Sequence, residues 1–180
     1  IAGGARVVQY RDKKHPPEIR RRHARKISDL CRRHGVLFLV NDDVALAMET
    51  GADGVHLGRE DMGLRAARAL IGDNKLIGVS CYNELERALA AEQDGADYIA
   101  FGSFFPSRTK PGAIRATPEL LRAARTQLRI PVVAIGGITP ENGATLIEAG
   151  ADMLAVIEGV FGQPDIRAAA QRYADLFPKT

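Results

Sequence analysis

The apolar positions of this chain fall into short runs that alternate with longer stretches of helical periodicity. The short runs are rich in β-branched and aromatic residues, as strands are. They predict strands at 6–10, 36–40, 54–57, 76–79, 97–101, 131–135 and 153–157. The longer stretches predict helices at 17–34, 43–50, 63–71, 84–94, 118–128, 140–149 and 163–176. The pattern therefore predicts a uniform series of units, each a strand followed by a helix.

A Gly-Ala-Asp triplet recurs at 51–53, 95–97 and 150–152, each time between a predicted helix and the next predicted strand. Glycine is favoured just after the last turn of a helix, because the left-handed conformation found there carries no Cβ clash. We expect these triplets to be structural turns at the end of the sheet that provides stability rather than chemistry.

Uniform alternation of strands and helices predicts a parallel α/β sheet. We expect a (β/α)8 TIM barrel, forming a single domain over 1–180 of the 180 residues. Only seven units are visible, so the first strand and helix of the barrel are expected to lie upstream of Ile1. The alternative is an open Rossmann sheet, which is disfavoured because no Gly-x-Gly-x-x-Gly motif follows the first strand.

Composition and charge exclude several classes of function. The net charge of +3 is too small to indicate a nucleic-acid partner, and no apolar run is long enough to span a membrane. Cys31 and Cys81 are far apart, which predicts free thiols and a reducing, cytoplasmic location. The sequence does not set the oligomeric state and leaves a homo-oligomer open.

Polar residues gather directly after the predicted strands, and in a barrel all strand ends meet on one rim. Gln9 and Arg11 are two residues apart, so their side chains point to the same face of the first strand, and Lys13 follows just beyond. The positive charges of Arg11 and Lys13 suit a polyanionic ligand, with an exposed strand end as the alternative. Asp42 and Asp61 follow the next two strands and offer part of the oxygen shell that Mg²⁺ prefers beside phosphate.

Several of these residues have alternative roles. Asp43 is expected to cap the helix that follows it, and the same role is open for Asp61. His56 is equally a buried core histidine or an inward-facing rim residue.

Two later segments also indicate phosphate binding. The loop at 102–110 reads GSFFPSRTK and carries the donors Ser107, Thr109 and Lys110, so we expect it to act as a lid over a diphosphate. Gly136 and Gly137 lead from a strand into a helix, and their backbone N–H groups resemble the phosphate site common in such barrels, together with the turn around 158–159.

Six motifs together resemble the thiamine phosphate synthase family, and they span nearly the whole chain. They are QYRDK at 9–13, NDD at 41–43, GVHLGRED at 54–61, GVS at 78–80, GSFFPSRTK at 102–110 and AIGGI at 134–138. The resemblance implies a transferase that joins 4-amino-2-methyl-5-hydroxymethylpyrimidine diphosphate to a thiazole phosphate, giving thiamine phosphate and diphosphate. It also implies a dissociative route, in which diphosphate leaves before the thiazole nitrogen attacks.

The resemblance implies roles for individual residues as well. The substrates would be bound by Gln9, Arg11, Lys13, Asn41, Ser80, Ser107, Thr109, Lys110, Gly137, Ile157 and Glu158. Mg²⁺ would be held by Asp42 and Asp61, and catalysis would depend on Arg11, Ser80 and Lys110. Glu158 departs from the family pattern, because a small hydroxyl residue is frequent at that position. Its carboxylate would repel a phosphate unless the side chain turns away or meets Arg108.

Two alternatives remain at this point. A thiazole tautomerase shares the fold but needs no diphosphate, and the intact set of Gln9, Arg11 and Lys13 argues against it. A non-catalytic barrel that binds phosphate is disfavoured by the number of polar groups on the rim.

Overall fold

The computed structural model describes residues 1–106, 112 and 114–178, and its seven strands form one parallel sheet in chain order. The strands are β1 (Val7–Tyr10), β2 (Leu37–Asn41), β3 (Gly54–Leu57), β4 (Leu76–Tyr82), β5 (Tyr98–Gly102), β6 (Val132–Ile135) and β7 (Met153–Ala155). The helices are α1 (Pro17–Arg33), α2 (Val44–Glu49), α3 (Leu64–Ile71), α4 (Leu85–Gln93), α5 (Pro118–Gln127), α6 (Pro140–Glu148), α7 (Glu158–Phe161) and α8 (Ile166–Ala174).

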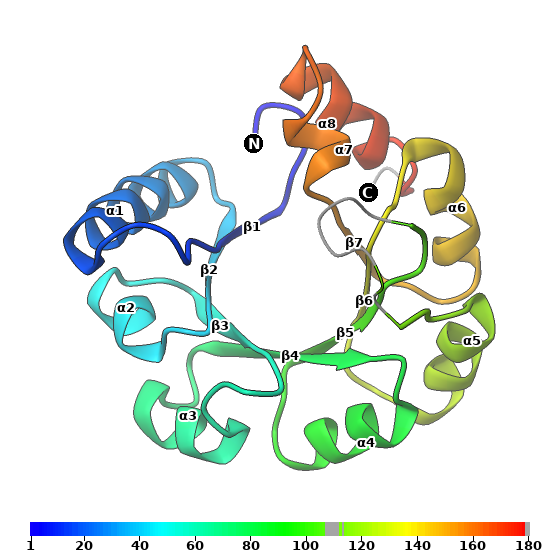
Figure 1. Cartoon of the computed structure of the whole chain (residues 1–180), viewed down its shortest axis with the longest axis horizontal. Helices are drawn as coiled ribbons and strands as arrows, with labels where there is room; N and C mark the ends of the chain where they lie inside the picture. The colour runs from blue at the N-terminus through cyan, green and yellow to red at the C-terminus, as the bar shows by residue number, and fades with distance from the viewer. Residues whose placement is uncertain (107–111, 113, 179–180) are drawn as a thin grey trace.

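The strand order distinguishes a barrel from a Rossmann sheet. A doubly wound sheet reverses its strand order at a switch point and carries helices on both faces. Here each strand pairs with the next one in the chain, and the helices lie outside the curved sheet (Figure 1). The barrel prediction is therefore confirmed. Within the described residues β1 and β7 are the two edges of the sheet, and the unit expected before Ile1 stays a prediction.

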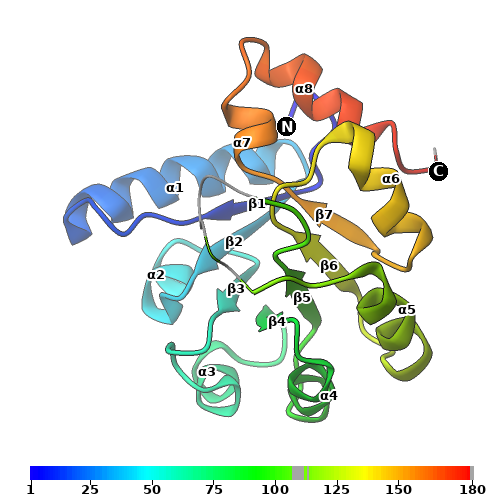
Figure 2. The same ribbon diagram turned by 45° about the vertical axis from the view of Figure 1, so that its right-hand side comes forward.

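The N-terminal segment lies beside α8 in both views of the ribbon (Figures 1 and 2). A Cβ added at Gly3 would meet the backbone of Arg167 and the side chain of Ala170 in that helix. The close approach of the two segments therefore requires glycine at position 3.

The elements differ from the sequence prediction by more than two residues at three places. β4 continues to Tyr82, because a shift in register after Ser80 lets Tyr82 pair with Phe101. The short helix α7 follows β7 and was not predicted. The last helix begins at Ile166, because the side chain of Asp165 caps it by accepting the N–H of Ala168 at 2.9 Å.

The strands separate two apolar regions. Side chains that point outward pack under the helices and are almost fully buried, as at Phe38, Ile77 and Phe101. Side chains that point inward fill the barrel with a smaller cluster around Leu39, Tyr98, Ala100 and Val133. Because side chains on one face recur every second residue, the next inward positions toward the carboxyl ends of four strands are polar. These positions are Gln9, Asn41, His56 and Ser80.

The Gly-Ala-Asp turns join neighbouring strands at the other end of the sheet. The carboxylates of Asp53, Asp97 and Asp152 accept the N–H groups of Phe38, Ile77 and Val132 at 2.7, 2.7 and 2.8 Å. The backbone N–H of each aspartate donates to the carbonyl of the same partner at 2.8 Å. The three glycines have φ of 64°, 94° and 116°, which favours glycine. The triplets are structural, as expected.

Candidate active site

The carboxyl ends of the first three strands bring a lysine and two carboxyl groups together. The Lys13 ammonium lies 2.6 Å from a carboxylate oxygen of Asp42. The Asp42 backbone has a positive φ of 67° and is held by donation of its N–H to the His56 carbonyl at 2.8 Å. The Asp61 carboxylate accepts the N–H of Gly58 at 2.6 Å, so its loop folds back toward β3. The expected proximity of Asp42 and Asp61 is therefore present in the fold.

The two carboxyl groups are hydrogen-bonded to each other, and each shifts the pKa of the other. Burial raises the pKa of Asp61, and the bond to Asp42 raises it further. Burial acts in the same direction on Asp42, but the hydrogen bond from Asp61 and the Lys13 ammonium outweigh it and lower its pKa. Two such carboxyl groups would both ionise readily only beside an additional positive charge.

A chain of hydrogen bonds crosses the barrel interior next to this pair. The Nδ1 atom of His56 lies 2.8 Å from the Tyr98 hydroxyl, and its Nε2 atom lies 2.9 Å from Oγ of Ser80. Burial lowers the pKa of His56 to about 4, so the ring is neutral at neutral pH. The side chain of Gln9 also hydrogen-bonds the Tyr98 hydroxyl.

The neutral His56 ring determines which groups donate and which accept along this series of hydrogen bonds. When Gln9 donates to Tyr98 and the Tyr98 hydroxyl donates to Nδ1, the Nε2–H group donates to Ser80. The hydroxyl proton of Ser80 is then free to bind a ligand. Ser80 stands where the β4 register shifts, a feature that re-aims side chains beside active sites.

The loop after β6 is shaped by two glycines. Gly136 and Gly137 have positive φ angles of 104° and 64°. A Cβ at Gly136 would collide with Ser103, and a Cβ at Gly137 would collide with the Phe105 and Pro106 carbonyls. The two glycines therefore let the segment that follows β5 pack directly on the loop that follows β6.

Comparison with known proteins identifies the family. The family model for thiamine monophosphate synthase matches residues 1–160. The chain belongs to the thiamine monophosphate synthase family. It is 54% identical over 177 residues to a thiamine-phosphate synthase of Thioalkalivibrio sulfidiphilus, covering 98% of this chain and 84% of the relative. It is 52% identical over 179 residues to that of Nitrosospira multiformis, covering 99% and 76%.

A solved structure supports the same assignment. The thiamine phosphate pyrophosphorylase of Pyrococcus furiosus superposes with a TM-score of 0.90 at 39% identity, covering 97% of this chain and 84% of that protein. Membership of the thiamine monophosphate synthase family makes the chain a transferase of thiamine biosynthesis. No helix among the described residues has the length and hydropathy to cross a membrane.

Glu158 is the residue whose carboxylate was expected to repel a phosphate unless its side chain turns away. It is the first residue of α7 and is exposed. Its carboxylate lies against Gly162, with Oε1 at 2.6 Å from the position of an added Cβ, toward the far end of that short helix. The side chain therefore turns away from the start of α7, which leaves the backbone of Ile157 and Glu158 accessible.

The remaining expectations have mixed outcomes. Asp43 caps α2 by accepting the Leu46 N–H at 2.9 Å, as predicted. Asp61 does not cap α3, whose N-cap residue is Gly63. His56 combines both of its alternatives, because it is buried, satisfied and inward-facing. Four residues of the expected lid lie outside the described residues: Ser107, Arg108, Thr109 and Lys110.

Two residues of the site were missed by sequence reasoning. Tyr98 is the first residue of the apolar strand β5 and gave no polar signal, but Gly78 was a clue, because a Cβ there would collide with the Tyr98 ring. Asp12 accepts the N–H groups of Lys14 and His15 at 3.0 and 3.1 Å and the Tyr10 hydroxyl at 3.0 Å. These hydrogen bonds, led by that of Lys14, hold the pKa of Asp12 well below its usual range and shape the turn around Lys13.

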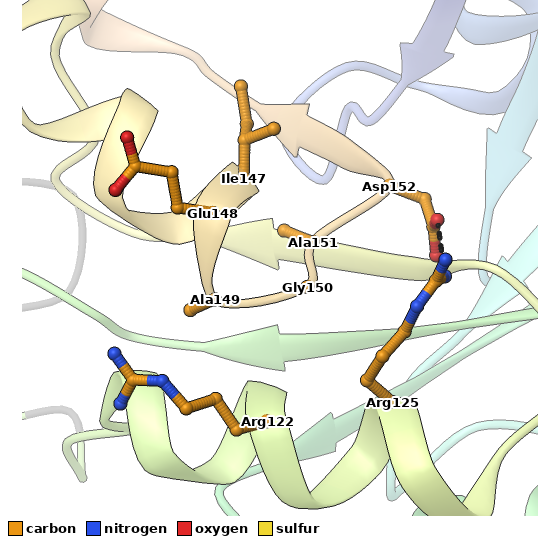
Figure 3. Close-up of a pocket in the computed structure, with 8 residues that line it drawn as sticks. All are labelled: Arg122, Arg125, Ile147, Glu148, Ala149, Gly150, Ala151 and Asp152. Atoms are coloured by element: carbon orange, nitrogen blue, oxygen red, sulfur yellow. Dashed lines mark hydrogen bonds and ion pairs between the residues drawn. The ribbon is translucent and has the colours of Figure 1, made fainter.

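A surface hollow lies at the opposite end of the strands (Figure 3). It is lined by Arg122, Arg125 and residues 147–152. Arg125 pairs with Asp152 of a Gly-Ala-Asp turn at 3.1 Å. Because this turn precedes β7, the hollow lies at the structural end of the barrel and not on the rim that carries the polar side chains.

Proposed function

We propose that this chain makes thiamine phosphate from a pyrimidine diphosphate and a thiazole phosphate, and that Asp42 and Asp61 hold the Mg²⁺ of the reaction. The observation that carries the proposal is the hydrogen-bonded pair of carboxyl groups beside Lys13 at the mouth of the barrel. Relatives more than half identical over almost the whole chain are thiamine-phosphate synthases, which supports the same reaction.

The donor set fits Mg²⁺. A divalent cation between the two groups would remove the repulsion between two ionised carboxylates. Two carboxylates supply part of an octahedral oxygen shell and leave positions for water and diphosphate oxygens, as is usual for Mg²⁺. When bound, the metal neutralises negative charge on the departing diphosphate.

Cationic side chains bind the diphosphate from the side of β1. Arg11 is exposed and follows the inward-facing Gln9 by two residues, so its guanidinium is able to bind phosphate oxygens in a bidentate manner. Lys13 pairs with Asp42 and would bridge the metal site to the diphosphate. Lys110 is proposed to meet the same group, from the loop outside the described residues.

The pyrimidine binds deeper in the barrel, against Asn41 and Ser80. The hydrogen bonds from Gln9 through Tyr98 and His56 fix the Ser80 hydroxyl and leave its proton for the ring. In a dissociative reaction the protein forms no bond to the substrate. Its contribution is to orient the two substrates and to stabilise the separating charges.

The phosphate of the thiazole substrate is assigned to the other side of the mouth. Gly137 has the left-handed backbone needed to turn its N–H toward a ligand, and the start of α7 offers the backbone of Ile157 and Glu158. Ser107 and Thr109 are proposed to complete this part. A thiazole tautomerase would have no use for the pair of aspartates, which favours the synthase.

Thermal melting tests the metal and diphosphate site. Mg²⁺ and inorganic diphosphate together should stabilise the chain by about 2.7 kcal/mol at one hundred times the dissociation constant, and each alone should stabilise it less. Asp42→Ala should stay folded and lose the combined effect. The control is Asp94→Asn, which changes a surface ion pair with Arg65 at the opposite end of the barrel. Equal stabilisation of Asp42→Ala and the unmodified chain would refute the metal assignment.

A synthase assay tests the reaction itself. Thiamine phosphate should form from the two substrates in a Mg²⁺-dependent manner, and Asp42→Ala should reduce its rate strongly. Full turnover by Asp42→Ala at limiting Mg²⁺ would contradict the proposed role of the aspartate pair.

A further inference from the structure

A second group of metal-ligating side chains lies between β1 and α1, on the outer side of the sheet. Asp12 and His15 belong to the loop that joins these elements, and His23 belongs to α1. Their potential ligand atoms all lie within 4.8 Å of one another. The group lies on the helix side of β1, because Tyr10, which hydrogen-bonds Asp12, packs in the outer core with Ala24 and Val40.

We propose that Asp12, His15 and His23 bind a transition-metal ion of the zinc class. The side-chain chemistry separates this group from the rim pair. Imidazole nitrogens suit Zn²⁺, Ni²⁺ or Cu²⁺, whereas Mg²⁺ prefers oxygen ligands throughout. Two imidazoles and one carboxylate leave a fourth position for water, as in zinc sites with three protein ligands.

The geometry needs only small side-chain movements. Zinc ligands at about 2.0–2.2 Å from a tetrahedral ion lie roughly 3.3 Å apart. Nδ1 of His15 is already 2.7 Å from a carboxylate oxygen of Asp12. The rings of His15 and His23 meet edge to face, with centroids 5.6 Å apart. Because the His15 side chain is 55% exposed, it is free to turn and admit an ion between the three groups.

Hydrogen bonds orient the Asp12 carboxylate toward His15. Its Oδ1 accepts the backbone N–H groups of Lys14 and His15, while Oδ2 accepts the Tyr10 hydroxyl and faces His15. Partners of this kind orient a ligating carboxylate in metal sites. The positive charges of the nearby Lys14 and Arg20 repel a metal ion, so we expect a lower affinity than at a four-ligand structural zinc site.

A bound ion would tie the loop after β1 to α1. This loop carries Arg11 and Lys13, so occupancy of the outer site would restrict the segment that presents both cations to the rim. The inference does not depend on the proposed function, because none of its three ligands is assigned to the substrates or to Mg²⁺.

The test uses tag-free protein in excess Mg²⁺, with Zn²⁺ added in a calorimetric titration and Co²⁺ followed by its visible absorption. His15→Ala and His23→Ala should each weaken Zn²⁺ binding at least about tenfold and lose the intense Co²⁺ bands of a low-symmetry four-coordinate site. The matched control is His34→Ala, which removes the exposed imidazole just after α1. This variant should bind one ion per chain as the unmodified protein does.

Three outcomes decide the proposal. Loss of binding in both cluster variants, with binding retained in His34→Ala and Asp42→Ala, supports it. Equal Zn²⁺ affinity in His23→Ala and the unmodified chain overturns it. Loss of the Co²⁺ bands in Asp42→Ala alone would place the ion at the rim pair and also overturn it.

Discussion

Removing the hydroxyl of Tyr98 tests whether the hydrogen bonds inside the barrel serve the reaction. Tyr98 and His56 are each 8% exposed, and the Tyr98 hydroxyl lies 2.8 Å from Nδ1 of His56. Tyr98→Phe keeps the ring and opens no cavity, but it leaves that nitrogen without its partner. An unsatisfied buried polar group costs about 1–3 kcal/mol, so we expect the free energy of unfolding to fall by that amount.

The same change should reduce catalysis independently of stability. His56 loses one of the two contacts that orient it, and the position of the Ser80 hydroxyl then becomes less defined. A misplacement of about 1 Å costs roughly 100-fold, so we expect kcat/KM for the pyrimidine diphosphate to fall by about 10- to 100-fold. The fall corresponds to about 1.4–2.7 kcal/mol of transition-state stabilisation.

Urea unfolding and steady-state synthase kinetics measure the two effects separately. The control is Ser28→Ala, which removes a buried hydrogen bond of 2.9 Å to the Thr50 carbonyl on the outside of the barrel. It should be destabilised by about 1 kcal/mol with kcat/KM unchanged. If Tyr98→Phe is destabilised but keeps the kcat/KM of the unmodified chain, the hydrogen-bonded chain has no role in catalysis and this reasoning fails.

Three further predictions concern pH, stability and the diphosphate. Burial lowers the pKa of His56 from about 6.5 to about 4 in the fold, so the stability that its neutral ring contributes should be lost as the pH falls from 6.5 towards 4. The free energy of unfolding in urea, measured at pH 6.5 and at pH 4, should differ less for His56→Gln than for the unmodified chain. Asp97→Ala should destabilise the fold by about 1–3 kcal/mol because the buried N–H of Ile77 loses its acceptor, whereas Asp94→Ala should cost at most about 1 kcal/mol in the same unfolding assay. Arg11→Ala should lower kcat/KM in the synthase assay, and unchanged turnover would exclude it from diphosphate binding.

The fold was predictable because each element carries its own periodicity. Strand and helix periods differ, the alternation is uniform, and the Gly-Ala-Asp turns mark the helix ends. What could not be read was contact between elements. The extension of β4 to Tyr82 depends on pairing with Phe101 in the next strand, which is decided only when the strands pack. The start of α8 was missed although its cap is local, since Asp165 accepts the N–H of Ala168 three residues further on.

For the site, too, the sequence predicted where each residue lies along its own element but not which side chains meet. Placement after a strand was sufficient to bring Asp42 and Asp61 together, because the carboxyl ends of parallel strands share one rim. The pairing of Lys13 with Asp42 and the hydrogen bond between His56 and Tyr98 were not predictable. His56 and Tyr98 are 42 residues apart, and neither the spacing nor the type of these residues indicates that they meet.

The aspartates at the two ends of the barrel show what separates a structural carboxylate from a functional one. Asp97 and Asp152 each accept a backbone N–H from the preceding strand and an arginine hydrogen bond, so their charge is already compensated. Asp61 has one backbone donor, and burial and the neighbouring Asp42 raise its pKa. Because a carboxylate with enough donors gains little from a cation, the structural aspartates should not bind Mg²⁺. On the rim, Asp42 has one ammonium partner and Asp61 one backbone donor, so each has fewer donors than the structural aspartates. A divalent ion would relieve the repulsion between the two carboxylates, as proposed above.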